Sequence, residues 1–185
     1  MKNQLILLLL LAALASSGAV KPAFSSDVVT KEKPLVKIEA DIRGASTLVL
    51  VVDDAGDGYG CDWADWVEPV LIGPQGEVKL TSLEWRSASS GHASPRKDTN
   101  VEGREMRVGQ QAISGIGTHA NSVIEYDIAG KGFTTFRAQG GLDRGGTDQG
   151  CGSTVRFLVY GLKQGETVPK NAASPNKQGG LTTEE

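Results

Sequence analysis

The stretch Ser153-Thr-Val-Arg-Phe-Leu-Val-Tyr-Gly161 alternates between two sets of side chains. Positions 155, 157 and 159 hold valine, phenylalanine and valine, whereas positions 154, 156 and 158 hold threonine, arginine and leucine. Successive side chains of a β-strand point to opposite faces, so this period of two predicts a strand with one strongly apolar face. No segment sustains a helical period over about twelve residues.

Similar short segments precede this strand, with glycine-rich turns between them. They span residues 46–53, 77–85, 104–113 (two short strands around Gly109), 122–128 and 133–138. The sequence Gly73-Pro-Gln-Gly76 marks a chain reversal before the second of them. About eight short strands with such turns are typical of an antiparallel sandwich or barrel. The pattern therefore predicts an all-β sandwich over residues 35–163.

The two ends of the chain differ in composition from this β-rich part. Residues 1–19 resemble a secretory signal peptide: Lys2 is followed by the apolar run Leu5–Ala15 and then by small residues. A membrane anchor is the alternative, but a spanning helix needs roughly 20 apolar residues, more than this run offers. We expect a bacterial protein that is secreted or periplasmic and has no membrane span. Residues 20–34 are expected to form a linker, and residues 164–185 a disordered tail.

Composition excludes several functional classes. Glycine accounts for 24 of 185 residues without a Gly-X-Y period, which excludes collagen. A net charge of −3 and the lack of a Lys/Arg cluster argue against a nucleic-acid partner. No nucleophile elbow, zinc-protease motif or phosphate loop is present, so no enzyme is expected. A Ser-His-Asp triad or a catalytic carboxylate pair is recognised by geometry, so the sequence excludes neither arrangement.

Cys61 and Cys151 are the only two cysteines. In an oxidising compartment they are expected to form a disulfide, which would close a loop of 90 residues. A reactive thiol is the alternative, but it would need a neighbouring base, and the nearest ionisable residues in the sequence are acidic. The disulfide would bring residues 57–63 against residues 141–152.

The acidic loop that begins at Asp53 has two interpretations. Asp53 and Asp57 fit two positions of an EF-hand loop when Gly58 takes its glycine position, but positions 3 and 12 fall on Ala55 and Ala64. The loop is therefore not an EF-hand. A looser calcium site with Asp53 and Asp57 among its ligands is one interpretation, and a solvated turn is the other. No other cofactor is expected.

The two loops joined by the cysteines hold the candidate binding residues. Tyr59 and Trp63 could supply rings for the apolar face of a sugar, although each ring could instead belong to the core. Strand alternation places Trp63 and Trp66 on opposite faces, so at most one of them should be fully buried. Candidate hydrogen-bonding groups are Asp62, Asp143, Arg144, Asp148 and Gln149. The alternative is that the glycines only turn the chain and the carboxylates face water.

Two further residues are interpreted as structural, and one as exposed. His119 precedes the strand at 122–128 and is assigned a hydrogen-bonded structural role rather than a ligand contact. Trp85 is also assigned a structural role. His92 falls on a loop and is expected to be exposed.

Four ordered segments carry a family resemblance. The sequence Gly115-Ile-Gly-Thr-His-Ala-Asn-Ser122 resembles the G-[IL]-G-x-H-A-x-S segment of the NPCBM/NEW2 family of carbohydrate-binding modules. Residues 83–91 are similar to its opening L-x-W-x-S-A-x-x-G, and residues 132–136 to its next strand. Residues 140–143 and 150–160 are similar to its ending.

The resemblance, over residues 80–162, implies a galactose-binding-domain-like jelly roll that binds a glycan or glycoconjugate without catalysis. The chain departs from the family pattern at His92, where an aromatic residue is frequent, and in having Cys61 and Cys151. The alternative function is a structural or protein-interaction sandwich that does not bind sugar.

Overall fold

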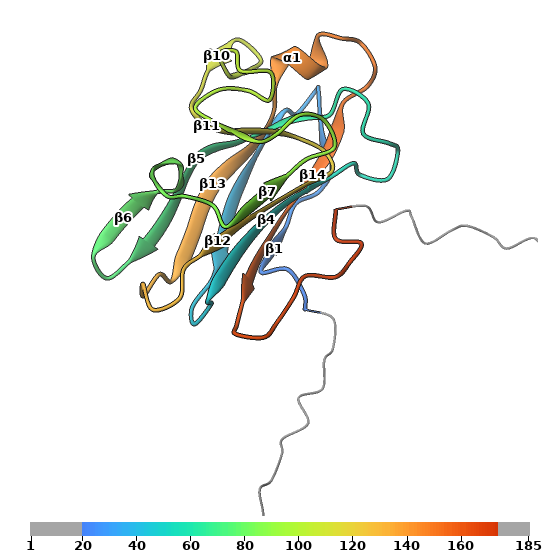
Figure 1. Cartoon of the computed structure of the whole chain (residues 1–185). Coiled ribbons are helices and arrows are strands. Elements are labelled where there is room, and N and C mark those ends of the chain that lie inside the picture. Colours follow the sequence, from blue (N-terminus) through green and yellow to red (C-terminus); the bar gives the residue numbers. More distant parts are fainter. Residues whose placement is uncertain (1–19, 174–185) are drawn as a thin grey trace, which may run out of the picture.

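Two antiparallel β-sheets pack face to face to form the domain (Figure 1). The computed structural model describes residues 20–173. The predicted signal peptide, residues 1–19, lies outside the described residues, as do residues 174–185. Within residues 20–173, no helix combines the length and the apolar character that crossing a membrane requires. The predicted antiparallel β-sandwich of the galactose-binding-domain-like class is confirmed.

Sheet I has the strand order β1-β14-β4-β12-β7, with β2 also paired to β14. Its strands are β1 (Phe24–Ser25), β2 (Val29–Thr30), β4 (Thr47–Asp53), β7 (Ser87–Ser89), β12 (Ser122–Asp127) and β14 (Thr154–Leu162). Leu50 pairs with Ile124 on β12 and with Val159 on β14, so apolar side chains meet across three adjacent strands. The alternation predicted for residues 122–128 is present, since Ile124 and Tyr126 are buried and their neighbours are less so.

Sheet II has the order β3-β13-β5-β11-β8, with β6 paired to β5. Its strands are β3 (Leu35–Asp41), β5 (Trp63–Gly73), β6 (Gly76–Lys79), β8 (Arg96–Lys97), β11 (Gly115–His119) and β13 (Thr135–Leu142). A separate two-stranded hairpin joins β9 (Arg107–Val108) to β10 (Gln111–Ala112). The helical segments are short: a 3₁₀ turn η1 (Leu80–Ser82) and the helix α1 (Arg144–Thr147).

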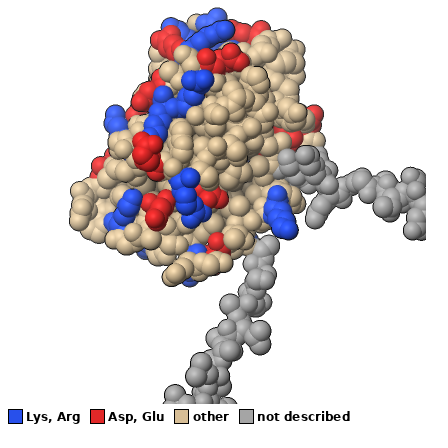
Figure 2. Space-filling view, viewed as in Figure 1, with Lys and Arg blue, Asp and Glu red and all other residues tan. Residues whose placement is uncertain are grey.

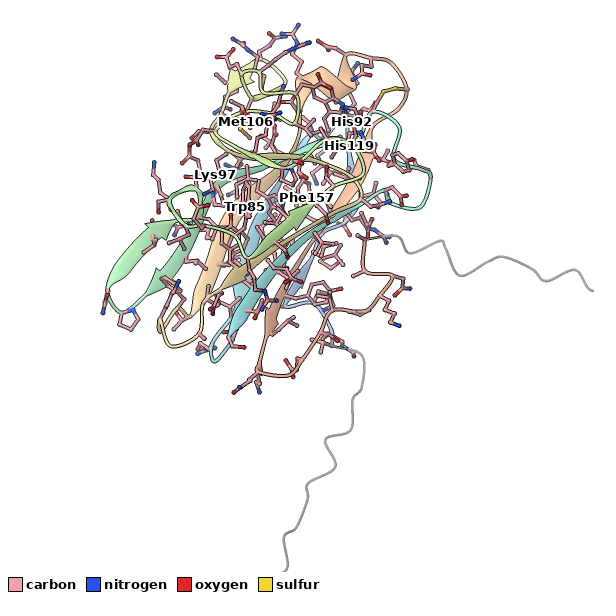
Figure 3. The ribbon with its side chains drawn as sticks, in the orientation of Figure 1. Trp85, His92, Lys97, Met106, His119 and Phe157 are labelled. Atoms are coloured by element: carbon pink, nitrogen blue, oxygen red, sulfur yellow. A yellow bond between two sulfur atoms is a disulfide. The ribbon has the colours of Figure 1, made fainter. Side chains whose placement is uncertain are left out.

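The core lies between the sheets and is centred on Trp66. This side chain is 0% exposed, and its indole meets the rings of Phe157 and Phe136 edge to face, with centroids 5.0 and 6.0 Å apart. The Phe157 ring, visible between the sheets in Figure 3, lies directly on the backbone of Gly140. A Cβ at Gly140 would come 2.5 Å from Phe157 Cδ2, so this position requires glycine.

A long connection covers part of the outer face of sheet II. We call residues 98–113, which include β9 and β10, the cap. A Cβ at Gly117 would come 2.4 Å from the carbonyl oxygen of Thr99, and one at Gly141 would come 2.6 Å from Val108 Cγ2. The cap therefore lies against the backbone of β11 and β13. Three apolar residues of the cap itself, Val101, Met106 and Val108, are buried.

The expectation about the two tryptophans is confirmed, although Trp63 is more enclosed than a strand face open to water would be. Trp63 and Trp66 lie on opposite faces of β5, and only Trp66, at 0% exposure, is fully buried; Trp63 is 9% exposed. Trp63 belongs to the outer face, where α1 covers it: a Cβ at Gly145 would come 2.5 Å from Trp63 Cζ3. The glycines of the loop thus do more than turn the chain, because Gly145 and Gly146 leave room for the indole.

The segments expected as linker and tail are partly ordered against sheet I. Within residues 20–34, β1 and β2 both pair with β14. After β14, Val168, Ala172 and Ala173 pack on an outer-face cluster that includes Val49 and Tyr160. The described part of the tail therefore buries apolar side chains, although their spacing has no regular pattern. Residues 174–185 of the expected tail lie outside the described residues.

The predicted disulfide between Cys61 and Cys151 is confirmed, with the two Cα atoms 6.0 Å apart. It joins the loop before β5 to the loop between α1 and β14; Figure 3 draws it as a yellow bond near α1. Ser153 adds a second link between the same loops, because its hydroxyl donates a 2.7 Å hydrogen bond to the carbonyl oxygen of Cys61. The two loops meet as the sequence predicted.

Replacing both cysteines should destabilise the domain. A crosslink over 90 residues restricts the unfolded chain, so the variant Cys61→Ser/Cys151→Ser should lose about 2–5 kcal/mol of unfolding free energy in urea denaturation. As a control, a reducing agent should lower the urea midpoint of the wild type and leave that of the variant unchanged. An unchanged midpoint in the variant would contradict this role.

Candidate functional site

A hollow of about 240 Å³ lies where α1 meets the cap. Its walls are Trp63 from β5, Asp143, Arg144, Gly145 and Asp148 from the α1 region, and Asn100, Arg104, Glu105 and Arg107 from the cap. Four of these residues, Trp63, Asp143, Arg144 and Asp148, were predicted from the sequence as binding residues. The hollow is thus the place where the predicted residues are concentrated.

The Asp143 carboxylate holds the two walls of the hollow together. Its Oδ1 accepts hydrogen bonds from the Gly145 backbone N–H at 2.7 Å and from Asn100 Nδ2 at 3.2 Å. Its Oδ2 accepts one from the Arg107 backbone N–H at 3.0 Å. The first of these bonds caps the N-terminus of α1. Asp143 is 1% exposed, so its carboxylate lies behind the wall of the hollow and does not project into the cavity.

A second carboxyl group, Asp65, is buried behind Asp143. It is 0% exposed, and within residues 20–173 neither of its oxygens has a fixed hydrogen-bond donor. Burial raises the pKa of Asp65 well above its usual value, and the neighbouring Asp143 raises it further. Both effects favour the neutral, protonated form of Asp65 over the charged form.

Two ion pairs line the rim of the hollow. Arg144 Nε lies 2.7 Å from Asp148 Oδ2, one helical turn along the chain, and Arg144 Nη1 lies 3.2 Å from Gln110 Oε1 in the cap. Arg107 Nε lies 2.7 Å from Glu105 Oε2. The rim is therefore rich in paired donors and acceptors, the groups that bind hydroxyls.

Beside Trp63 the outer face continues as a row of rings. His119 on β11 pairs with Trp63 on β5 in the strand register. The His119 ring makes edge-to-face contacts with Tyr59 and His92, with centroids 6.1 and 5.6 Å apart; His92 and His119 are labelled together in Figure 3. His92 is exposed and pairs with Glu102 of the cap, with 3.0 Å between Nε2 and Oε1.

His119 and Tyr59 differ in their exposure. His119 is buried, and its Nδ1 contacts the carbonyl oxygen of Ala120. Burial lowers the pKa of His119, and the adjacent His92 lowers it further, so its ring is neutral at pH 7. Tyr59 is 53% exposed and is the only predicted ring that presents a face to solvent. Trp85 packs on the core and carries the Lys97 ammonium 5.0 Å from its ring centroid.

Two other predicted residues lie outside the hollow. Asp62 is 0% exposed; its Oδ1 accepts from the Thr154 backbone N–H at 3.0 Å, and its Oδ2 has no partner among the described residues. Burial raises the pKa of Asp62 to about 7, with further contributions from Asp57 and Asp54. Gln149 is exposed, and its amide donates a 2.8 Å hydrogen bond to the carbonyl oxygen of Gly145.

Asp53 and Asp57, the two residues considered as calcium ligands, each have a protein partner. Asp53 is buried and pairs with Arg156, with 3.0 Å between Oδ1 and Nε, whereas Asp57 accepts a 2.7 Å hydrogen bond from the Thr154 hydroxyl. No group of three or more His, Cys, Asp or Glu in residues 20–173 is arranged to hold a metal ion. The acidic loop is fixed by hydrogen bonds and by the Arg156 ion pair.

A larger hollow, of about 610 Å³, lies elsewhere on sheet II. It is lined by Phe24, by Lys37, Ile38 and Glu39 of β3, by Val67 and Glu68 of β5, and by Arg137, Ala138 and Gln139 of β13. It contains none of the predicted binding residues. We therefore place the candidate site at the smaller hollow, where buried hydrogen bonds hold the lining in position.

Sequence reasoning missed the contribution of the cap. Asn100, Arg104, Glu105 and Arg107 were not predicted as site residues. Residues 104–113 were interpreted only as two short strands, and Asn100 lies outside them. The contact with the cap is reflected in the sequence at Gly117 and Gly141, since any larger residue there would collide with the cap. Without the fold, a sequence cannot distinguish such a glycine from one that turns the chain.

Stability should fall as pH rises through the acid range. The folded-state pKa of Asp62, about 7, is above its usual value of 3.8. The folded protein therefore retains a proton that the unfolded chain has released, and Asp62 lowers the unfolding free energy by roughly 1.4 kcal/mol per pH unit between pH 4 and 7. Above pH 7 this dependence levels off. Burial raises the pKa of Asp65 as well, so Asp65 acts in the same direction.

Urea denaturation across pH 4 to 8 measures this dependence. Asp62→Asn keeps the acceptor for Thr154 and cannot ionise, so its pH dependence should be flatter and its stability at pH 8 greater than that of the wild type. Asp27→Asn, at an exposed position, is the control for loss of one negative charge. Equal slopes for the wild type and Asp62→Asn would refute the assignment.

Comparison with known proteins agrees with the geometry. The NPCBM/NEW2 domain matches residues 16–72 and 76–178. This match is longer than the resemblance over residues 80–162 and includes β3, β4 and β5. Neither the search of curated proteins nor the search of solved structures gave a significant match. Since the family match covers most of the chain and the fold is the expected β-sandwich, the chain belongs to the NPCBM/NEW2 family.

Proposed function

We propose that this domain is a non-catalytic module that binds a glycan at the hollow between α1 and the cap. The observation that carries the proposal is the rim of the hollow, where two arginine–carboxylate pairs lie beside the largely buried ring of Trp63. Sugar rings have apolar faces edged with hydroxyls, and each hydroxyl both donates and accepts hydrogen bonds. The paired donors and acceptors of the rim match the hydroxyls, and the part of Trp63 that lines the hollow offers an apolar surface.

The size of the hollow favours the end of a glycan chain over its middle. Pockets for drug-sized ligands measure about 300–1,000 Å³, and this one is smaller, at about 240 Å³. A single terminal sugar unit therefore fits better than several consecutive units. The exposed ring of Tyr59, beside His119 at the same end, is placed to contact the next part of the glycan.

The exposed surface gives less support to the alternative of a protein-interaction sandwich. Protein interfaces are centred on buried aromatic and aliphatic anchors. In the described part of the chain, only Val28 and Tyr59 are large hydrophobic residues with high exposure. They are isolated side chains and not a patch.

Export is part of the proposal. The signal-like residues 1–19 direct the protein out of the cytoplasm, to the periplasm or the medium, where polysaccharides and glycoconjugates are accessible. The disulfide fits that setting, since such bonds persist in oxidising compartments.

A glycan array probed with the purified protein tests the function. The wild type should bind a defined set of glycans. Replacing one rim pair, in Arg144→Gln/Asp148→Asn, should weaken binding at least about tenfold, because two charged hydrogen-bonding groups are removed. The urea midpoint should change little, since both side chains are substantially exposed.

The matched control is the variant Arg137→Gln/Glu77→Gln. This ion pair is exposed to a similar degree but lies on β13 and β6, and Arg137 lines the larger hollow. The control should bind like the wild type. Loss of binding in the control with retention in Arg144→Gln/Asp148→Asn would move the site to the larger hollow, and a wild type that binds no glycan would refute the proposed function.

A further inference from the structure

The three arginines of the hollow differ in how far their guanidinium groups are used. Arg107 and Arg144 each form an ion pair with a neighbouring carboxylate. Arg104 is exposed, and no carboxylate within residues 20–173 lies within ion-pair distance of its guanidinium. Figure 2 shows basic and acidic side chains gathered at the end where α1 and β10 lie. Arg104 is therefore the one cation of the hollow whose guanidinium forms no close ion pair among the described residues, although its charge acts on Glu102 at longer range.

The backbone of Arg104 is nevertheless held firmly. Its N–H donates to Asn100 Oδ1 at 3.0 Å, and its carbonyl accepts from the Asn100 N–H at 2.9 Å. Asn100 is 3% exposed and donates in turn to Asp143. The cap thus fixes where the Arg104 side chain begins without using any of its guanidinium donors. A group that is positioned in advance loses less entropy when it binds a ligand.

The carboxylates of the hollow already accept hydrogen bonds from nearby donors. Asp143 already accepts three hydrogen bonds, and Glu105 and Asp148 each accept from one arginine. Formal charges in the lining balance, but each guanidinium has five N–H donors and most are unused. The lining therefore has more unused hydrogen-bond donors than unused acceptors. A carboxylate or sulfate, which only accepts, fits such a surplus better than a neutral hydroxyl, which must also donate.

From these observations we infer that the hollow selects glycans whose terminal unit carries an anionic group, and that Arg104 binds that group. The inference rests on the proposed glycan-binding function and narrows its ligand class. The shared chemistry is a planar carboxylate or a sulfate on a sugar. A guanidinium can bind either through two parallel N–H donors.

An array that pairs anionic glycans with neutral counterparts tests the inference. Each uronate chain is printed beside its methyl ester, which keeps the sugar and removes the charge, and each sulfated chain beside its desulfated form. The wild type should prefer the anionic member by at least about tenfold. Uronate spots and sulfate spots then identify which of the two anions is bound. Binding should also weaken between about 50 and about 300 mM salt, because salt screens an exposed charge.

Variants at position 104 assign the effect to one residue. Arg104→Gln should lose at least about tenfold in affinity for the preferred anionic glycan and should become less sensitive to salt. Arg104→Lys keeps the charge but not the two-pronged geometry, so it should recover only part of the affinity. Arg86→Gln is the control, because Arg86 is exposed and pairs with Glu125 on the other sheet. It should bind like the wild type.

The outcomes separate this inference from the proposed function. Wild-type binding to neutral glycans as strong as to their anionic partners would overturn the anion selectivity and leave glycan binding intact. An unchanged Arg104→Gln variant would overturn the role of Arg104. No binding to any glycan would refute both. An unchanged urea midpoint in Arg104→Gln confirms that any loss of affinity reflects the missing side chain and not unfolding.

Discussion

The carboxylate of Asp143 is the interaction on which the functional end of the molecule depends. It caps α1, bonds to the cap at Asn100 and Arg107, and neighbours the buried carboxyl group of Asp65. Segments distant in sequence thus share one buried acceptor. A buried carboxylate is stable only where donors surround it, so the three segments cannot separate without leaving an uncompensated charge. The hollow exists because this requirement brings α1 and the cap together.

The covering of sheet II by the cap and α1 follows from the same arrangement. An outer strand face normally meets water and holds polar side chains. Here Trp63, Asp65 and Val67 on the outer face of β5 are buried, and β5 runs through the middle of its sheet. Glycines at positions 117 and 141 let the cap lie directly on the strands. Rigid strands beneath the hollow thereby hold its lining in place.

The proposed function depends on the hydrogen-bond donors that the buried network around Asp143 leaves unused. Asp143 and Asn100 satisfy one another and the backbone, whereas the arginines on the rim keep most of their donors for a ligand. Asp62 and Asp65 are buried acids with raised pKa values, so their burial makes the stability of the fold depend on pH. The disulfide stabilises the same end of the fold by joining the two loops beside α1.

The sequence by itself determined the all-β class, the disulfide, the family and the strands buried on one face, such as β12 and β14, because alternation records that situation directly. It also indicated the two loops that meet at Cys61 and Cys151. Only the tertiary structure showed that β5 is buried on both faces, which is why this strand has no alternation. It also showed that Asp143 joins α1 to the cap. The physical reason is that the cap and α1 meet through contacts between residues far apart in sequence, such as Arg107 and Asp143, which leave no periodic pattern in the chain.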